Sequence, residues 1–365
     1  MGKFYSKQTN IWTKSRSTKE LPVYPHLTIS NFPKNEGETI ILKDGRSLGF
    51  KEYNFKHITQ HPITNNLNKE HVILLIPGLP CTRFFCHPQV LSSLEFHQQQ
   101  EPKIPNNMST ESLNSYTLQI KLYVLERPGI GLSTFAKRSF LEFSQDIKEF
   151  CDQKKIENCS LIAYSAGGPY GLAAAYSLGK STDNSSKPLI TKAAIISSIA
   201  PYNVPNLTSN MPLKLKFAWW LTKNWTGLLS LIARMESNAV MKDPVKASRE
   251  GRSDAPQSDI ECIENLKGVE EMFIESSLEM YSRGQIETEC YEYSLWGKDW
   301  GFQLNEISGG VKCKVWHGEE DSGTTISMGK YIALQIPGCE ASFVEEKGHL
   351  LYFEVWNDIV DWLVT

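Results

Sequence analysis

Short apolar runs and longer segments of helical period alternate along most of this chain. Residues 39–42 and 47–53 flank Asp44 and Gly45, a two-residue turn signal that predicts an antiparallel hairpin. The runs typical of buried strands are 72–76, 120–125, 160–164, 193–199, 312–316 and 341–345. Helical period is present at 139–153, 166–178, 326–335 and 351–364. This order predicts an α/β fold with a mostly parallel central sheet and helices on both of its faces.

Residues 201–300 break the alternation. They contain a helical, tryptophan-rich stretch at 213–235, a polar linker at 242–259 and further helical pattern to about residue 283. We expect a helical cap inserted above the carboxyl ends of the strands, where open α/β sheets bind ligands. The predicted domains are a core of residues 22–200 and 301–365, the cap at 201–300, and a flexible basic tail at 1–21. A polar stretch at 95–118 is expected to be a surface insertion.

Composition limits the possible functions. The chain has 365 residues, of which 41% are hydrophobic and 22% charged, as in soluble globular enzymes. A net charge of -3 gives no basic field for nucleic acid, and no apolar run reaches the roughly 20 residues that span a bilayer. The eight cysteines form no CxxC pair, which favours reduced thiols in the cytoplasm. No clustered His, Cys and Asp spacing indicates a metal, so no metal or cofactor is expected.

Ser165 is the candidate nucleophile. It lies between the strand predicted at 160–164 and a helix of small residues, and a sharp strand-to-helix turn would expose its hydroxyl. Such a turn requires small residues two positions on either side, which Ala163 and Gly167 provide. The amide of Ala166, at the start of the helix, is available to a developing oxyanion. The segment alone is equally compatible with a serine that only caps an Ala/Gly-rich helix.

The candidate base and acid follow later strands. His349 comes after the strand at 341–345 and Asp321 after the strand at 312–316, so both belong to the same sheet edge as Ser165. Asp321 competes with its neighbours Glu319 and Glu320, and a lone His349 is compatible with an ordinary loop residue. His317 precedes the acid and is expected to be structural.

Two further expectations concern the surroundings of these residues. The other histidines, including His57 and His87, fall mostly in polar segments that are predicted to lie at the surface.

Residues 77–83 follow the strand at 72–76, and the amide of Leu79 is the candidate second donor of an oxyanion hole. By itself that segment is also compatible with a plain Gly-Pro turn.

With these segments in order, the chain resembles the α/β-hydrolase superfamily from about Glu38 to its end, and within it the esterase-like branch with a helical cap. Pro-Gly-Leu-Pro-Cys-Thr-Arg at 77–83 is similar to that branch's His-Gly-x-Pro-Gly-Ser-Arg loop. Residues 126–133 resemble the branch's Asp-Arg-Pro-Gly-x-Gly-x-Ser loop, and residues 163–170 resemble its Gly-x-Ser-x-Gly-Gly-Pro-Tyr elbow. Residues 317–321 resemble its His-Gly-x-x-Asp motif, and residues 348–349 match its Gly-His pair. The chain departs from these motifs at Pro77 for His, Glu126 for Asp and Ala163 for Gly.

The resemblance implies a serine hydrolase, with hydrolysis of a carboxylic ester as the first expectation. Ser165 would attack, His349 would take its proton and Asp321 would orient the imidazolium, while the amides of Leu79 and Ala166 would bind the oxyanion. A binding or receptor-like protein with slow turnover and an amide or carbon–carbon bond hydrolase remain the alternatives. The substrate partner is a small ester, with a weak preference for a hydrophobic one from the aromatic stretch at 217–225. Aromatic residues at helical spacing more often pack a cap against its core.

The first residues carry a separate signal. Gly2 stands in a Met-Gly-x-x-x-Ser pattern that matches N-myristoylation, and five basic residues occur by position 19. One acyl chain with a basic patch would give peripheral membrane association of a cytoplasmic enzyme. An unmodified tail is the alternative.

Overall fold

A computed structural model describes residues 22–60, 70–99, 116–180, 188–204, 206–307 and 309–365. Gly2 and the rest of the predicted tail at 1–21 lie outside these residues, as does most of the predicted insertion at 95–118. No helix in the described ranges is both long and apolar enough to cross a membrane.

The core is an eight-stranded sheet with the strand order β1-β2-β4-β3-β5-β6-β7-β8. Its strands are β1 (Glu38–Ile41), β2 (Ser47–Thr59), β3 (His71–Ile76), β4 (Tyr116–Leu125), β5 (Cys159–Tyr164), β6 (Ile190–Ile196), β7 (Lys312–Gly318) and β8 (Glu340–Val344). The β1–β2 and β2–β4 pairs are antiparallel, and all later neighbours are parallel. The predicted hairpin and mostly parallel sheet are therefore confirmed.

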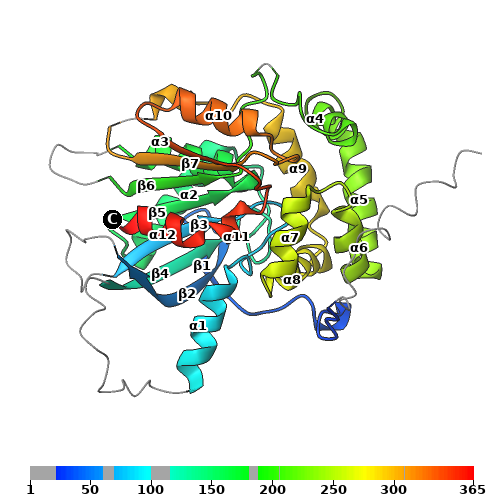
Figure 1. Ribbon diagram of the computed structural model, residues 1–365, viewed down its shortest axis with the longest axis horizontal. Helices are drawn as coiled ribbons and strands as arrows, with labels where there is room; N and C mark the ends of the chain where they lie inside the picture. The colour runs from blue at the N-terminus through cyan, green and yellow to red at the C-terminus, as the bar shows by residue number, and fades with distance from the viewer. Residues whose placement is uncertain (1–21, 61–69, 100–115, 181–187, 205, 308) are drawn as a thin grey trace, which may run out of the picture.

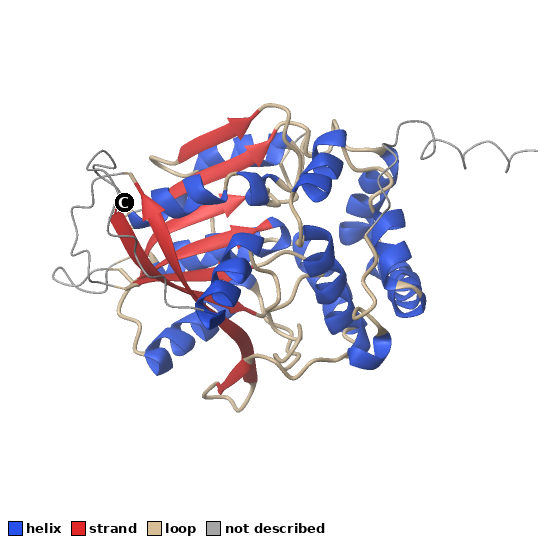
Figure 2. Cartoon of the chain, turned by 60° about the horizontal axis from the view of Figure 1, so that its bottom comes forward, coloured by secondary structure: helices blue, strands red, loops and turns tan. Residues whose placement is uncertain are grey.

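Side chains of each central strand alternate between two hydrophobic cores. On β3, Leu74 and Ile76 join one core, while Ile73 and Leu75 join the other, as the period of two in a strand requires. The first core is covered by α2 (Phe140–Lys154), α3 (Gly168–Leu178) and α10 (Ile326–Gln335). The second is covered by α1 (Pro88–Gln99), α11 (Leu351–Glu354) and α12 (Trp356–Val364). The resulting sheet between two helical layers is visible in Figures 1 and 2.

Six helices gather at one end of the sheet, on the right in Figure 1. They are α4 (Leu213–Asn224), α5 (Thr226–Lys242), α6 (Pro244–Gly251), α7 (Gln257–Asn265), α8 (Val269–Ser282) and α9 (Ile286–Trp296), and we call them the cap. The polar linker expected at 242–259 is wrong in part, because α6 lies within it. The Asp243 side chain accepts from Lys246 N and Pro244 occupies the first turn, which together start this short helix.

The segment before β1 lies against the cap. Leu27 and Phe32 pack on Ile274 and Leu278 of α8. The first described residues are thus joined to the cap by a small hydrophobic cluster, in addition to being continuous with the sheet.

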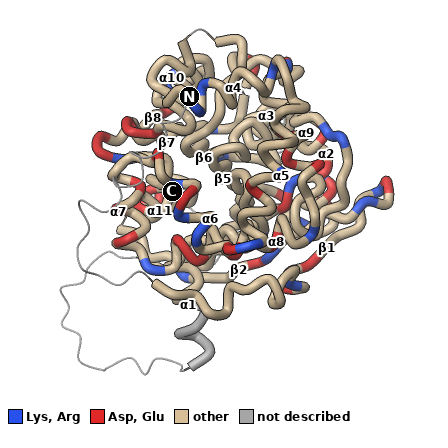
Figure 3. Tube along the Cα trace, turned by 90° about the vertical axis from the view of Figure 1, so that its right-hand side faces the viewer, with Lys and Arg blue, Asp and Glu red and all other residues tan. Residues whose placement is uncertain are grey.

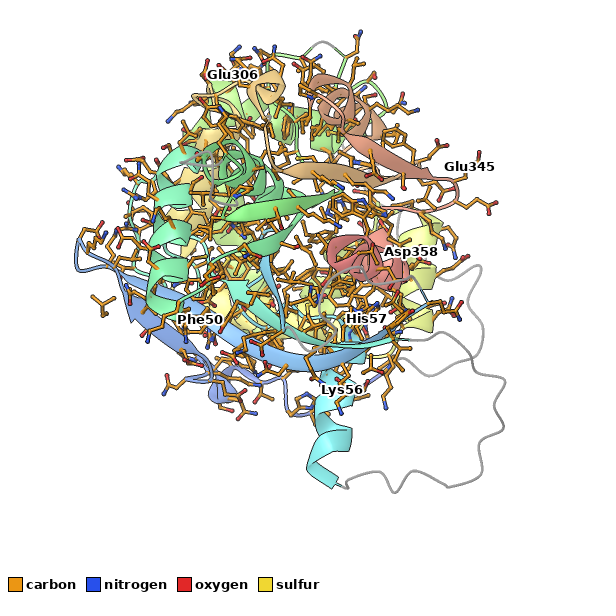
Figure 4. All side chains as sticks on the ribbon, turned by 90° about the vertical axis from the view of Figure 1, so that its left-hand side faces the viewer. Phe50, Lys56, His57, Glu306, Glu345 and Asp358 are labelled. Atoms are coloured by element: carbon orange, nitrogen blue, oxygen red, sulfur yellow. The ribbon has the colours of Figure 1, made fainter. Side chains whose placement is uncertain are left out.

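Two further expectations need correction. Helix α1 was not predicted, and it takes up the first residues of the segment expected to be a surface insertion from residue 95. His57 and His87 are buried, although their segments are polar. His57 Nε2 lies 2.7 Å from Asp361 Oδ1 on α12, at the side of the molecule shown in Figure 4, and His87 stacks on Trp356. Each imidazole therefore has a hydrogen-bond partner from a segment far along the chain, Asp361 for His57 and the Phe353 carbonyl oxygen for His87.

Candidate active site

Ser165 lies at a tight turn between β5 and α3. Its backbone has φ of 54°, in the left-handed region that a residue other than glycine rarely adopts. A short 3-10 turn over Ser165–Gly167 leads directly into α3. A Cβ on Gly167 would lie 2.3 Å from the Ile76 carbonyl oxygen, so only glycine fits there. The strand, the strained serine and the close approach are the features expected of an exposed nucleophile.

The departure at Ala163 has a structural explanation. A Cβ added to Gly171 on α3 would lie 2.3 Å from the Ala163 Cβ. The extra methyl group of Ala163 therefore occupies space that Gly171 leaves open on the facing helix.

The structure brings Ser165, His349 and Asp321 together at the carboxyl ends of their strands. His349 Nε2 lies 3.0 Å from Ser165 Oγ, and His349 Nδ1 lies 2.8 Å from Asp321 Oδ2. Glu319 and Glu320, the competing acids, are exposed, whereas Asp321 is buried. The three predicted residues thus form one hydrogen-bonded chain from hydroxyl to imidazole to carboxylate.

Asp321 is held by the loop that follows it. Its Oδ1 accepts from the amides of Gly323 and Thr324, both at 2.9 Å, and its Oδ2 accepts from Thr324 Oγ1 at 2.8 Å. Burial raises the pKa of Asp321, but the charge and hydrogen bond of His349, together with the Thr324 hydroxyl, outweigh it, so the net pKa is lowered. The carboxylate is therefore ionised and fixed in orientation. Thr324 was not predicted as a site residue, although Asp-Ser-Gly-Thr at 321–324 is a recognisable Asx-turn pattern.

His317 supports the same loop. Its Nε2 lies 2.5 Å from the Thr324 carbonyl oxygen and 3.5 Å from Asp321 Oδ2. Burial lowers the pKa of His317, so the ring is neutral at the pH where most enzymes work. A neutral ring that donates to a backbone carbonyl agrees with the structural role expected for it.

A residue of the cap also reaches the His349 loop. Asp259, on α7, accepts from Leu350 N at 2.8 Å. A Cβ on Gly348 would lie 2.3 Å from Asp259 Oδ1, so glycine is needed for this approach. Burial alone would lower the pKa of His349, but the charges of Asp321 and Asp259 raise it above its ordinary value. Asp259 was not predicted as a site residue, because it lies in the segment expected to be a polar linker.

This arrangement predicts the pH dependence of hydrolysis. His349 must be neutral to accept a proton, so kcat/KM is expected to fall as the pH drops through its raised pKa, above 6.5. The Asp259→Asn variant removes one negative charge but keeps an oxygen to accept from Leu350. Because the imidazolium then loses part of its stabilisation, the acid limb of the kcat/KM profile is expected to move to lower pH. Initial rates on a soluble ester across the pH range measure this shift.

Glu264→Gln is the matched control, since Glu264 is an exposed acid on the same helix. Its acid limb should coincide with that of the wild type. An unmoved limb in Asp259→Asn would show that Asp259 does not set the basicity of His349.

The loop containing Leu79 passes directly over Ser165. A Cβ on Gly78 would lie 2.7 Å from the Ser165 Cβ, and Leu79 lines the same cavity as Ser165. Arg127 donates to the carbonyls of Pro77 and Gly78, and its guanidinium pairs with Glu292 of α9, with Nε 2.6 Å from Oε1. A buried ion pair therefore fixes the loop against the cap. Leu79 and Ala166 as oxyanion donors remain a prediction, and their positions beside Ser165 suit it.

Glu126, which stands where the family pattern has Asp, is a buried scaffold residue. Its carboxylate accepts from the Arg83 amide, from Arg83 Nη1 and from the Leu132 amide. A Cβ on Gly49 would lie 2.3 Å from Glu126 Oε2, so the longer side chain fits because position 49 is glycine. None of these hydrogen bonds involves Ser165, Asp321 or His349. Glutamate in place of the family's aspartate therefore leaves the geometry of the triad intact.

Above Ser165 lies a cavity of about 700 Å³ between the sheet edge and the cap. Its apolar walls include Ile232, Met235, Val240 and Phe273, from α5 and α8. Its polar lining includes Lys214, Glu236, Arg252 and Ser322. Within the described ranges no three His, Cys, Asp or Glu side chains are grouped as metal ligands. The site offers a nucleophile, a base and a partly open, mostly apolar pocket.

Comparisons with known proteins address the fold. No protein-family model matches the chain, and no curated protein matches it by sequence. Solved structures match over nearly their whole length, among them the esterase EaEST from Exiguobacterium antarcticum, with a TM-score of 0.54, 14% identity, and coverage of 90% of this chain and 99% of that one.

Two other solved structures agree. A bromoperoxidase from Bacillus anthracis matches with a TM-score of 0.54, 13% identity, and coverage of 90% and 99% of the two chains. MGS-M2, an alpha/beta hydrolase enzyme from a Medee basin deep-sea metagenome library, matches with a TM-score of 0.51, 11% identity, and coverage of 90% and 96%. At these identities the likeness concerns the fold, and the chain has the fold of the α/β-hydrolase superfamily.

Proposed function

We propose that this protein is a serine hydrolase that acts on carboxylic esters. The observation that carries the proposal is the chain of hydrogen bonds Asp321–His349–Ser165 at the floor of the cavity. It is the arrangement that activates a serine hydroxyl, and it occurs here on a backbone turn that exposes that hydroxyl. The similar solved structures include an esterase and a bromoperoxidase, which are named for different reactions. The proposal of ester hydrolysis therefore depends on the triad and not on those names.

The proposed reaction proceeds through an acyl-enzyme. Ser165 Oγ attacks the ester carbonyl carbon while His349 Nε2 takes its proton, and Asp321 stabilises the imidazolium. The amides of Leu79 and Ala166 donate to the tetrahedral oxyanion. His349 returns the proton to the departing alcohol, and a water activated by the same imidazole then releases the acid. The sequence of steps uses only side chains, backbone amides and water.

The cavity favours an ester with an apolar part. Its size is within the range of small-molecule sites, and aliphatic and aromatic side chains of α5 and α8 form much of its wall. A hydrophobic acyl or alkyl group is therefore the preferred class.

Labelling with a fluorophosphonate probe tests the proposal. The wild type is expected to be labelled and Ser165→Ala unlabelled, since only an activated serine reacts with the phosphorus centre. Ser322→Ala is the matched control, because Ser322 also lines the cavity but has no hydrogen bond to His349 among the described contacts. It should label as the wild type does.

A panel of p-nitrophenyl esters of increasing acyl length then tests the substrate class. Turnover of these esters by the labelled wild type is expected, with medium or long chains preferred over acetate. A folded wild type that resists the probe would overturn the serine hydrolase. A labelled wild type that turns over no ester would overturn the ester class and retain the activated serine.

A further inference from the structure

Helix α4 of the cap exposes a stripe of large apolar side chains. Leu213, Phe217 and Trp220 have exposed fractions of 84%, 53% and 47%. Their spacing of four and three residues places them along one side of the helix. The Phe217 and Trp220 rings stack on each other with centroids 6.0 Å apart. The expectation that the aromatic stretch at 217–225 packs the cap against the core, or lines the cavity, is wrong for Phe217 and Trp220, whereas Trp219 does pack against the core.

Further large apolar side chains of the cap are exposed. Trp225, in the turn between α4 and α5, is exposed, and so is Met235 on α5. Met235 also lines the cavity above Ser165, whereas on α4 the cavity-lining Leu215 lies on the side of the helix opposite to the exposed stripe. We call Leu213, Phe217, Trp220, Trp225 and Met235 the apolar cap face. Exposed apolar residues grouped in this way mark an interaction surface.

The charged residues of α4 itself are all basic, although Lys214 Nζ lies 3.7 Å from Asp254 Oδ2 and Glu236 follows Met235 on α5. Residues 200–235 contain Lys214, Lys216, Lys223 and Arg234 and no Asp or Glu. At about 100° per residue, Lys214 lies on one side of the α4 stripe, and Lys216 and Lys223 lie on the other. Figure 3 views this side of the molecule, with α4 near its top. Apolar and aromatic residues flanked by lysines are the pattern of a helix that lies in a membrane interface.

The place where the N-terminal segment joins the cap supports the same partner. The Pro22 carbonyl accepts from Arg249 Nη2 of α6 at 2.8 Å, so the described chain begins on the cap. The 21 residues that precede it contain Lys3, Lys7, Lys14, Arg16 and Lys19 against a single acid, Glu20. The attachment point of this basic tail is therefore on the cap, the same part of the fold as α4.

We propose that the apolar cap face docks onto an anionic lipid surface. Phe217, Trp220 and Trp225 would enter the region between headgroups and acyl chains, and the lysines would contact lipid phosphates and carboxylates. Docking is a binding property and does not depend on the chemistry of Ser165.

Vesicle sedimentation of the full, unacylated chain tests the proposal. The wild type is expected to bind phosphatidylcholine vesicles that contain phosphatidylserine, and to bind pure phosphatidylcholine vesicles more weakly. In the Phe217→Ser/Trp220→Ser variant, partitioning onto anionic vesicles is expected to fall at least about tenfold, since two aromatic side chains that lipid would bury on docking are lost. Lys216→Gln/Lys223→Gln is expected to lose about fivefold for each charge.

Leu334→Ser is the matched control, because Leu334 is 80% exposed on α10, away from the cap. It should bind as the wild type does. Equal binding by the double serine variant and this control would overturn the proposal, as would failure of the wild type to bind anionic vesicles. Self-association of the wild type that the double serine variant abolishes would also overturn it, since a second copy would then cover the face.

Hydrolysis of a soluble short-chain ester separates this proposal from the proposed function. Neither Phe217 nor Trp220 lines the cavity, so the double serine variant should retain the wild-type rate. Loss of vesicle binding with retained hydrolysis supports docking by the cap. If the wild type binds vesicles but cleaves no ester, the docking proposal is supported and only the proposed ester hydrolysis is overturned.

Discussion

Ser165→Ala is expected to lower kcat for an ester substrate by roughly 10⁶-fold, the loss seen when a serine triad loses its nucleophile. His349 and Asp321 would keep their positions, but His349 Nε2 would have no hydroxyl to deprotonate. Alanine has the same steric conflict as serine at φ of 54°, so the free energy of unfolding should change little. Steady-state rates and a thermal unfolding curve of the same preparation measure both quantities.

Residual activity is informative in this variant. An alanine variant that keeps even about a hundredth of the wild-type kcat would show that another group is the nucleophile, since positioning and the oxyanion donors alone supply far less. Ser322→Ala, at the edge of the same cavity, should retain the wild-type rate.

Asp321→Asn is expected to lower kcat by roughly 10⁴-fold, as the same exchange does in a serine protease triad. The asparagine amide would present a donor to His349 Nδ1, which then holds its proton on Nε2 and cannot accept one from Ser165. Thr324 also donates to Asp321, so the variant leaves a buried hydroxyl without its charged acceptor. Rates on the same ester, at a pH above the pKa of His349, give the comparison.

Two controls accompany this variant. Glu320→Gln changes the exposed neighbour of Asp321 and should leave kcat unchanged, because Glu320 does not belong to the buried hydrogen-bond chain. The double variant Ser165→Ala/Asp321→Asn should be no slower than Ser165→Ala alone, because a triad acts as a unit. Additive losses in the double variant would mean that Asp321 works independently of the serine.

The regular core of this protein could be predicted because its signals are local. A buried parallel strand is a short apolar run, and the sheet uses such runs at β3, β5 and β7 much as expected. The turn at Ser165 could be anticipated for a similar reason, since Gly167 must be small wherever a strand turns sharply into a helix. Chain order then placed Asp321 and His349 at the same sheet edge.

The cap was harder to predict because its helices are short and depend on their neighbours. Helix α6 lies in a segment whose polar composition is typical of a linker, and its Glu270–Arg249 pair connects it to α8. Helix α1 packs Val90 into the core beneath α12, a contact with no local signal. Propensity is a weak prior for such elements, and tertiary packing overrides it.

Three features could be predicted from the amino-acid sequence: the alternation of strands and helices, the place of Ser165 at a strand-to-helix turn and the order of its two candidate partners. The first two depend on residues within about ten positions of one another, where periodicity and steric limits act directly, and the third follows from the order in which the strands occur along the chain. The tertiary structure alone decided that Asp321, not Glu319 or Glu320, reaches His349, that Asp259 of the cap adds charge beside it, and that Phe217 and Trp220 face outward. Those facts depend on contacts between segments far apart in the chain, and only the packed fold brings the segments together.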